Sequence, residues 1–135
     1  MEKLRLRRSA RKDSLRIEKL VYDYYYQLVP VVDGFSKEEE LVSKKIVDKD
    51  GKIIAGCNAY IYAWGGCYVD DMWGDEKYRR HELGSHALQA VKKVAEERGC
   101  CLIWLGTWDF QARPYYEKHG YRVFATIHDC PKGHI

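Results

Sequence analysis

The chain has 135 residues, of which 46% are hydrophobic and 32% are charged, and its formal net charge is +3 at pH 7. This length and composition predict a single folded domain over residues 1–135 and exclude a disordered tail. No apolar run approaches the roughly 20 residues that a membrane-spanning helix needs, and the N-terminus lacks the apolar segment of a secretory signal, so we expect a cytoplasmic protein with no membrane partner.

The N-terminal third predicts a strand, a helix and a loop. Residues 4–7 alternate apolar and basic side chains as a strand does. A helix follows, which Asp13 or Ser14 can cap and which Pro30 stops, and residues 31–40 have the character of a loop. The apolar stripe expected on this helix consists of Ile17, Leu20, Val21, Tyr24 and Leu28.

The middle of the chain predicts three antiparallel strands. Residues 41–47 and 52–63 have strand character, and the sequence Asp-Lys-Asp-Gly at 48–51 is a strong hairpin turn. Two glycines at 65–66 then turn the chain into a third strand over 67–73.

The last third predicts a helix over 83–98, a strand over 101–107, a short helix over 111–119 and a final strand over 121–127. A helix between two strands indicates a crossover connection. The whole order predicts a mixed, mainly antiparallel sheet covered by helices, which is an α+β domain.

The five cysteines contain no Cys-x-x-Cys pair, and three of them lie in apolar, strand-like runs. We therefore expect reduced, mostly buried thiols rather than a disulfide framework. The five are Cys57, Cys67, Cys100, Cys101 and Cys130.

A candidate phosphate site lies where the strand over 67–73 runs through a polar turn into the helix over 83–98. The first N–H groups of a helix have no intrahelical partner and carry the positive end of its dipole. Arg79 and Arg80 add charge just before this helix, so the turn is suited to a phosphate-bearing ligand, although such basic turns are common.

Two histidines in this turn do not predict a metal site. His81 and His86 are five residues apart, which turns their side chains about 140° from each other on a helix. Zinc proteases space the two histidines four apart, and no third ligand is in place here, so we expect no metal.

Two motifs resemble those of the GNAT-family N-acetyltransferases. The sequence Arg-Arg-His-Glu-Leu-Gly at 79–84 lies on the family's Arg/Gln-x-x-Gly-x-Gly/Ala motif. The sequence at 109–121, from Asp109 to Tyr121, is similar to the family's Asn-x-x-Ala-x-x-Leu-Tyr-Glu-Lys-x-Gly-Phe ending. The opening at residues 6–13 also resembles the family's first strand and helix start, so the resemblance covers nearly the whole chain.

The resemblance implies a GNAT-like fold and an enzyme that moves the acetyl group of acetyl-CoA directly to a primary amine of a small molecule. The strand end would hold the pantetheine through its backbone, and the N–H groups of residues 80–85 would hold the pyrophosphate. The cofactor-binding residues implied in this way are Met72, Trp73, Gly74, Arg79, Arg80, His81, Glu82, Leu83, Gly84, Ser85, Asp109, Ala112 and Tyr116.

Three residues are catalytic candidates. Tyr116 matches the tyrosine that usually protonates the departing thiolate. Asp70 or Asp71 could accept the amine proton, directly or through water, and alternation along a strand lets at most one of them line a given pocket. The plainer alternatives are that Tyr116 packs its ring and that the aspartates hydrogen-bond neighbouring backbone.

Two further features leave alternatives open. Tyr22 and Tyr26 lie opposite the apolar stripe of the first helix, where they either wall the acceptor pocket or are surface aromatics. The first 20 residues carry eight basic and three acidic side chains, which either attract a phosphate-bearing partner or merely form a solvated, charge-protected edge. The small net charge does not by itself indicate nucleic acid.

The chain departs from the pattern of the family that it resembles at three places. Glu82 stands at the motif's first glycine, and Trp104 and Gly106 stand where similar chains are often polar. The eight residues after Ile127 are a poor final strand, so we expect free strand edges and a homo-oligomer. A weak or inactive acyl-CoA-binding module, and an acetyltransferase of a protein amine or of tRNA, remain alternatives.

Overall fold

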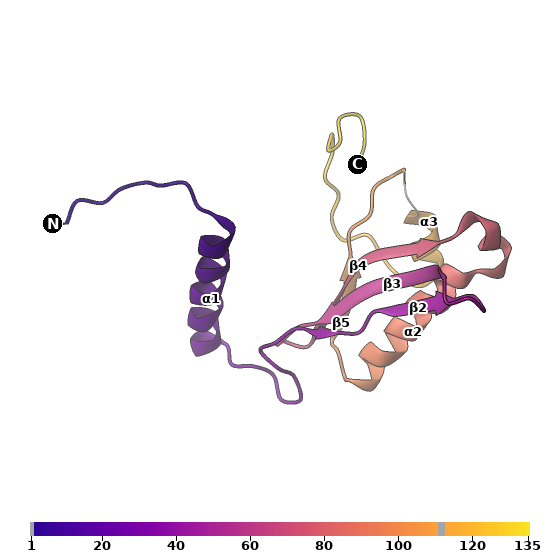
Figure 1. Ribbon diagram of the computed structural model, residues 1–135, viewed down its shortest axis with the longest axis horizontal. Coiled ribbons are helices and arrows are strands. Elements are labelled where there is room, and N and C mark those ends of the chain that lie inside the picture. The colour runs from indigo at the N-terminus through magenta and orange to yellow at the C-terminus, as the bar shows by residue number, and fades with distance from the viewer. Residues whose placement is uncertain (1, 111–112) are drawn as a thin grey trace.

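Five strands form one mixed sheet in the order β1-β3-β4-β5, and β2 also pairs with β3 (Figure 1). The computed structural model describes residues 2–110 and 113–135, and for residues 79–81 the backbone alone. The strands are β1 (Glu40–Leu41), β2 (Lys44–Val47), β3 (Ile53–Ile61), β4 (Gly66–Gly74) and β5 (Leu102–Leu105). All neighbours are antiparallel except β4 and β5, which are parallel, so the predicted α+β sheet with one crossover is confirmed.

The turn between β2 and β3 forms as predicted. One carboxylate oxygen of Asp48 accepts the N–H groups of Asp50 and Lys52, each at 2.9 Å. Gly51 has a φ of +83°, a backbone conformation that glycine adopts with little strain because it has no Cβ.

Helix α2 (Leu83–Glu97) covers one face of the sheet and supplies four of the ten buried core residues among those described. A six-residue 3-10 helix, η1 (Glu76–His81), leads into it, and the crossover returns the chain to β5. The buried core consists of Val42, Cys57, Ala59, Ile61, Cys67, Val69, Ala87, Leu88, Val91 and Ala95. Its α2 members, Ala87, Leu88, Val91 and Ala95, lie on one face of the helix, as the apolar spacing predicted.

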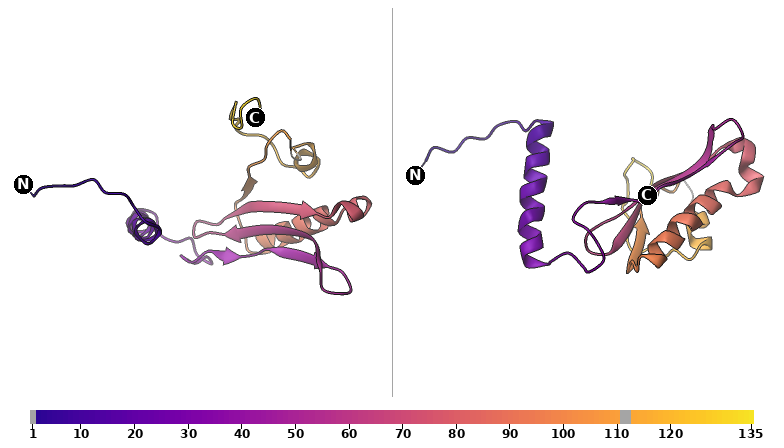
Figure 2. Two further views of the ribbon diagram at one scale, coloured as in Figure 1. Left: turned by 45° about the horizontal axis from the view of Figure 1, so that its top comes forward. Right: turned by 60° about the horizontal axis from the view of Figure 1, so that its bottom comes forward.

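Helix α1 (Arg11–Leu28) stands away from the sheet, and none of its residues is buried (Figure 1, Figure 2). It begins one turn earlier than Asp13 suggested, because the carboxylate of Asp13 accepts the Ala10 N–H at 2.9 Å from inside the first turn. The predicted strand over residues 4–7 is wrong: these residues are extended without a partner strand, and Leu4 and Leu6 are 81% and 98% exposed. Alternation makes a strand only where a neighbour offers hydrogen bonds.

The predicted strand over residues 121–127 is also wrong, since this segment runs without regular structure after α3 (Arg113–Lys118). The tail instead folds back onto the loop that follows β5. Trp108 Nε1 donates to the Cys130 carbonyl at 3.0 Å, and Asp109 binds His134 Nδ1 at 2.8 Å. These side-chain contacts hold the C-terminal residues in place without the backbone hydrogen bonds of a strand pair.

All five thiols are free, but the expectation that most are buried holds only in part. Cys57 and Cys67 are buried in the core, Cys100 is half-buried, and Cys101 and Cys130 are exposed. Among the helices of the described residues, none combines the length and apolarity needed to cross a bilayer.

Candidate functional site

The sheet opens between β4 and β5. β5 pairs with β4 only along Gly66–Val69, whereas β4 stays paired with β3 as far as Gly74. In the described part of the chain, residues 70–74 therefore have one edge without a neighbouring strand. The backbone N–H and C=O groups on such an edge can bind an extended ligand as an added strand would be bound.

The end of this edge meets the start of α2 through two glycines. A Cβ on Gly74 would lie 3.7 Å from the Gly84 nitrogen, and a Cβ on Gly84 would lie 2.9 Å from the Met72 sulfur. Any side chain at position 84 would therefore force Met72 to move. The predicted strand end and the predicted loop are thus neighbours in space.

The first turn of α2 faces the same opening. The N–H groups of Leu83, Gly84 and Ser85 have no intrahelical carbonyl to bind, because His86 is the first residue that donates back, to Glu82. Together with the helix dipole they form a local positive end that suits a phosphate oxygen. Arg79, Arg80 and His81 belong to η1, immediately before this turn.

Glu82 takes the conformation that explains why similar chains have glycine there. Its φ is 51° and its ψ is 39°, which is the left-handed region that disfavours residues with a Cβ. Its side chain is 65% exposed, and one carboxylate oxygen lies 3.8 Å from Lys118 Nζ at the end of α3. The charge is therefore directed toward a lysine and solvent.

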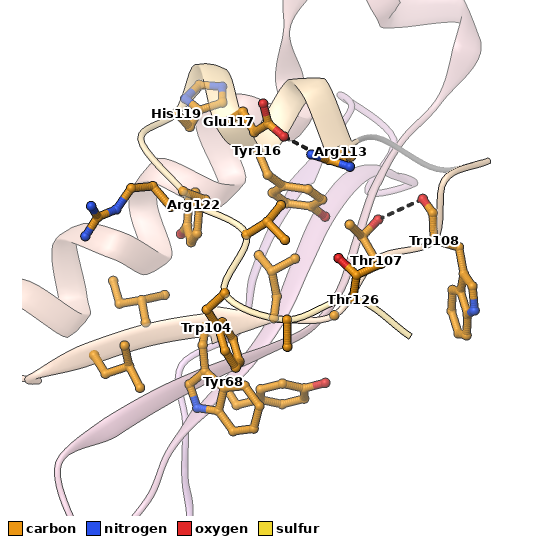
Figure 3. A pocket seen from close by; sticks show the side chains of 18 of the residues that line it. Tyr68, Trp104, Thr107, Trp108, Arg113, Tyr116, Glu117, His119, Arg122 and Thr126 are labelled. Atoms are coloured by element: carbon orange, nitrogen blue, oxygen red, sulfur yellow. Dashed lines mark hydrogen bonds and ion pairs between the residues drawn. The ribbon is translucent and has the colours of Figure 1, made fainter. Parts of the chain in front are cut away.

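A cavity of about 1280 Å³ lies between the sheet, α3 and the segment that follows α3 (Figure 3). Both Asp70 and Asp71 line it, so the expectation that only one of them can do so is wrong. A β-bulge is the cause: Asn58 pairs with Asp71 and Ala59 with Val69, which leaves Asp70 as the extra residue. Asp71 accepts a hydrogen bond from the Asn58 amide at 3.2 Å.

Tyr116 projects from α3 into this cavity, across from Tyr68 and Trp104 of the sheet (Figure 3). Its half-buried ring packs edge-to-face against Tyr115 and Tyr121, with centroids 5.5 and 5.9 Å away. Burial raises the pKa of Tyr116 to about 12, and the nearby Cys57, Tyr115 and Asp71 add to the effect. The hydroxyl is therefore protonated across the physiological range, where it can donate a proton or a hydrogen bond but is not a phenolate base.

Sequence reasoning missed a hydrogen-bonded cluster that joins α3 to the first turn of α2. The Tyr115 hydroxyl donates to Ser85 Oγ at 2.6 Å, and that oxygen lies 3.1 Å from His119 Nε2. Tyr115 lies in α3 and His119 is the first residue after it; their spacing of four, which brings two side chains to one side of a helical turn, is the signal that could have revealed them. The cluster holds α3, and with it Tyr116, against the opening.

A row of aromatic rings on the sheet face opposite α2 was also missed; we call it the aromatic face, and it consists of Tyr60, Tyr62, Tyr68 and Trp104. Tyr60 and Tyr68 alternate with core residues and therefore point away from α2. The Tyr68 and Trp104 centroids are 4.6 Å apart, and Trp104 Nε1 donates to the Tyr62 hydroxyl at 3.0 Å.

The other residues that the sequence analysis singled out have different surroundings. Asp109 borders the cavity, but its carboxylate is engaged by His134 and by the Ile135 N–H at 3.3 Å. Tyr22 and Tyr26 pack on Trp64 and are not among the residues that line the cavity. Ala112 falls outside the described residues. Within those residues, no group of three or more His, Cys, Asp or Glu side chains is placed to hold a metal ion.

Comparison with known proteins gives consistent matches. Residues 8–121 match the model of the acetyltransferase (GNAT) family. A blasticidin-S acetyltransferase from Streptomyces morookaense is 37% identical over 84 residues, which are 62% of this chain and 61% of that protein, so the match spans less than two thirds of the relative.

Two solved structures resemble the whole chain. The crystal structure of an acetyltransferase from Bacillus cereus is 32% identical and superposes with a TM-score of 0.86 over 97% of this chain and 91% of that one. The crystal structure of a putative acetyltransferase from Agrobacterium tumefaciens has a TM-score of 0.72 at 19% identity, covering 90% and 85% of the two chains, and supports the fold alone.

Proposed function

The chain belongs to the acetyltransferase (GNAT) family, and from this premise we propose that it transfers the acetyl group of acetyl-CoA directly to a primary amine of a small molecule. The observation that carries the proposal is the opening between β4 and β5, which ends at the first turn of α2. The alternative of an acyl-CoA-binding module rests on Glu82, which stands at the motif's first glycine within residues 80–85, the segment that we call the donor loop because it is expected to hold the pyrophosphate of acetyl-CoA.

The donor fits this opening by shape and by charge. Acetyl-CoA supplies an activated acetyl thioester, and its pantetheine arm is an extended chain with amide groups. The free edge of residues 72–74 offers complementary backbone groups, and the N–H groups of residues 83–85 offer a site for pyrophosphate oxygens. Gly74 and Gly84 have no side chains, and this allows the strand end and the start of α2 to lie close together.

The two acid–base roles are assigned to opposite walls of the cavity. Asp70 or Asp71, on β4, takes the proton that the amine must lose, directly or through water. Tyr116, on α3, gives its hydroxyl proton to the departing sulfur. Burial raises the pKa of Tyr116 to about 12, so the hydroxyl still holds that proton at neutral pH and can give it to the sulfur as the carbon–sulfur bond breaks.

The acceptor is placed beside the two aspartates of β4. A protonated amine is attracted by the carboxylates of Asp70 and Asp71, which both line the cavity. The relative named for blasticidin-S supports a small molecule over a protein amine. The exposed apolar side chains of Val123, Phe124 and Ile127 support a homo-oligomer.

The test is amine-dependent release of free thiol from acetyl-CoA, measured over a panel that includes blasticidin S, simple diamines and a lysine peptide, with a thermal-shift titration of acetyl-CoA beside it. We expect a rise in melting temperature and release with small amines. A rise without release from any amine would favour the binding module, release with the peptide alone would favour a protein acceptor, and neither signal would overturn the proposal.

A further inference from the structure

The N-terminal arm, which we define as residues 2–28, leaves its apolar surface open. No residue of α1 is buried, and Leu4 and Leu6 before it are almost fully exposed. The side chains of one helix face, which we call the stripe, are Ile17, Leu20, Val21, Tyr24 and Leu28. An amphipathic helix is normally stabilised by burying such a stripe.

The arm is held outward by its other side. Tyr22 and Tyr26, opposite the stripe, lie with ring centroids 6.4 and 5.6 Å from that of Trp64 in the β3–β4 turn. Trp64 Nε1 also donates to the Val29 carbonyl at 3.1 Å, and Lys37 lies over the Tyr26 ring at 5.3 Å. The stripe therefore faces away from its own chain, and folding the arm back would break these contacts.

The backbone at Val29, which follows α1, is consistent with the outward position of the arm. Val29 is extended, with φ −129° and ψ 99°, as a residue before a proline prefers to be. The helix thus ends in an extended residue, and the segment that follows leads to the sheet and leaves α1 standing to one side of it (Figure 2).

The aromatic face is the matching uncovered surface. The helix that packs on the sheet, α2, lies on the opposite face, while α1 stands clear of it (Figure 2). Tyr60, Tyr68 and Trp104 present apolar rings beside the exposed carboxylates of Asp70 and Asp71. The arm carries the opposite charge, with seven basic and two acidic side chains in residues 2–16.

We propose that two copies of this chain exchange their N-terminal arms, so that the stripe of each arm covers the aromatic face of the other copy. The two contacts are reciprocal and therefore close into a symmetric dimer. The match to the Bacillus cereus structure spans 97% of the chain, with a TM-score of 0.86. If the proposed function is right, the partner's arm also closes the acceptor side of the cavity; the exchange itself does not depend on that function.

Sedimentation velocity on the full chain tests the association. We compare the unmodified protein with Leu20→Glu, which puts a charge in the stripe, and with Gln89→Glu, which puts the same charge on the exposed side of α2. Exchange predicts a dimer for the unmodified protein and for Gln89→Glu, and a folded monomer by circular dichroism for Leu20→Glu. A monomeric unmodified protein, or a Leu20→Glu variant that still dimerises, would overturn the proposal.

Photo-cross-linking identifies the contact. Tyr24 in the stripe is replaced with p-benzoylphenylalanine, and Gln89 is replaced in the same way as a control. Exchange predicts a band of twice the chain mass on a denaturing gel for position 24 alone, with cross-linked peptides that contain Tyr60, Tyr68 or Trp104. Cross-links within one chain would mean that the arm folds back, and cross-links to another surface of the partner would mean a different dimer; either result overturns the proposal.

Discussion

Tyr116 is the side chain on which the proposed proton transfer depends most. Tyr116→Phe removes only the hydroxyl, so we expect turnover to fall by about ten- to a thousandfold while the affinity for acetyl-CoA is nearly unchanged. Steady-state kinetics together with calorimetric titration of acetyl-CoA separate the two effects. An unchanged turnover number would remove Tyr116 from the mechanism.

Tyr121 provides the matched control for that variant. Its ring packs against Tyr116, burial raises its pKa to about 12 in the same way, and its buried hydroxyl has no hydrogen-bond partner among the described residues. Removing an unpaired buried hydroxyl costs little. Tyr121→Phe should therefore leave turnover unaffected, and a loss equal to that of Tyr116→Phe would point to packing rather than proton transfer.

Glu82 combines two effects that substitutions can separate. Glu82→Gly removes both the charge near the donor loop and the left-handed strain, so we expect tighter acetyl-CoA binding, most clearly at low salt, and a stability gain of about 1 kcal/mol. Glu82→Gln removes the charge alone and should reproduce only the change in affinity.

Calorimetry at two salt concentrations and thermal melts measure these effects of Glu82. Equal or weaker binding by Glu82→Gly would mean that the carboxylate, which lies 3.8 Å from Lys118 Nζ, does not oppose the pyrophosphate.

Single residues of the site could be predicted where local spacing determines their position. The strand end and the loop come together because they follow each other in the chain, and Tyr116 lies on α3, the helix after β5. The joint exposure of Asp70 and Asp71 to one cavity could not be predicted, since a single bulge reverses the alternation on which the expectation depended. The link from Tyr115 to Ser85 joins residues 30 positions apart, which periodicity does not detect.

At the scale of elements, α2 is the support of both the core and the donor loop. Leu88 is 2% exposed and packs within the core cluster, so Leu88→Ala should lower the free energy of unfolding by about 2–5 kcal/mol through lost contacts and a cavity. The neighbouring Gln89 is exposed, and Gln89→Ala should change the free energy of unfolding by less than about 0.5 kcal/mol. Urea denaturation measures both, and equal effects would contradict the assigned face of the helix.

Helices and the central hairpin could be predicted because their signals are local. The apolar repeat gave α1 and α2, and the Asp-Lys-Asp-Gly turn fixed the pairing of β2 with β3. The absence of the two expected terminal strands, over residues 4–7 and 121–127, could not be predicted, because a strand forms only where a neighbouring strand offers it hydrogen bonds. Residues 4–7 lie on an arm that points away from the sheet, and the end of the chain is held by Trp108 and Asp109 instead.

At the scale of the whole molecule, the buried acids predict how stability depends on pH. Burial raises the pKa of Cys57 from about 9 to about 12, and that of Tyr116 from about 10 to about 12. The folded protein therefore keeps protons that the unfolded chain loses, so the stability from these groups is complete below about pH 9 and declines as the pH rises toward 12.

Urea denaturation between pH 8 and pH 10.5 tests this alkaline loss. We expect the unfolding midpoint to fall steadily over that range, and Cys57→Ala to show a shallower fall from a lower starting stability, since the variant lacks one of the buried acids. A midpoint that is flat or rises with pH would contradict the buried, protonated state of these groups.

Hydrogen exchange followed by mass spectrometry, with and without saturating acetyl-CoA, tests the central claim most directly, because that claim places the donor between β4 and β5. Residues 72–74 are paired with β3 on one edge only, and the amides of residues 83–85 lack intrahelical partners, so amides in both segments should exchange readily in the free protein. We predict that acetyl-CoA slows exchange in both segments together and leaves β2 unchanged. Unaltered exchange in both segments, or protection confined to another part of the chain, would contradict the account.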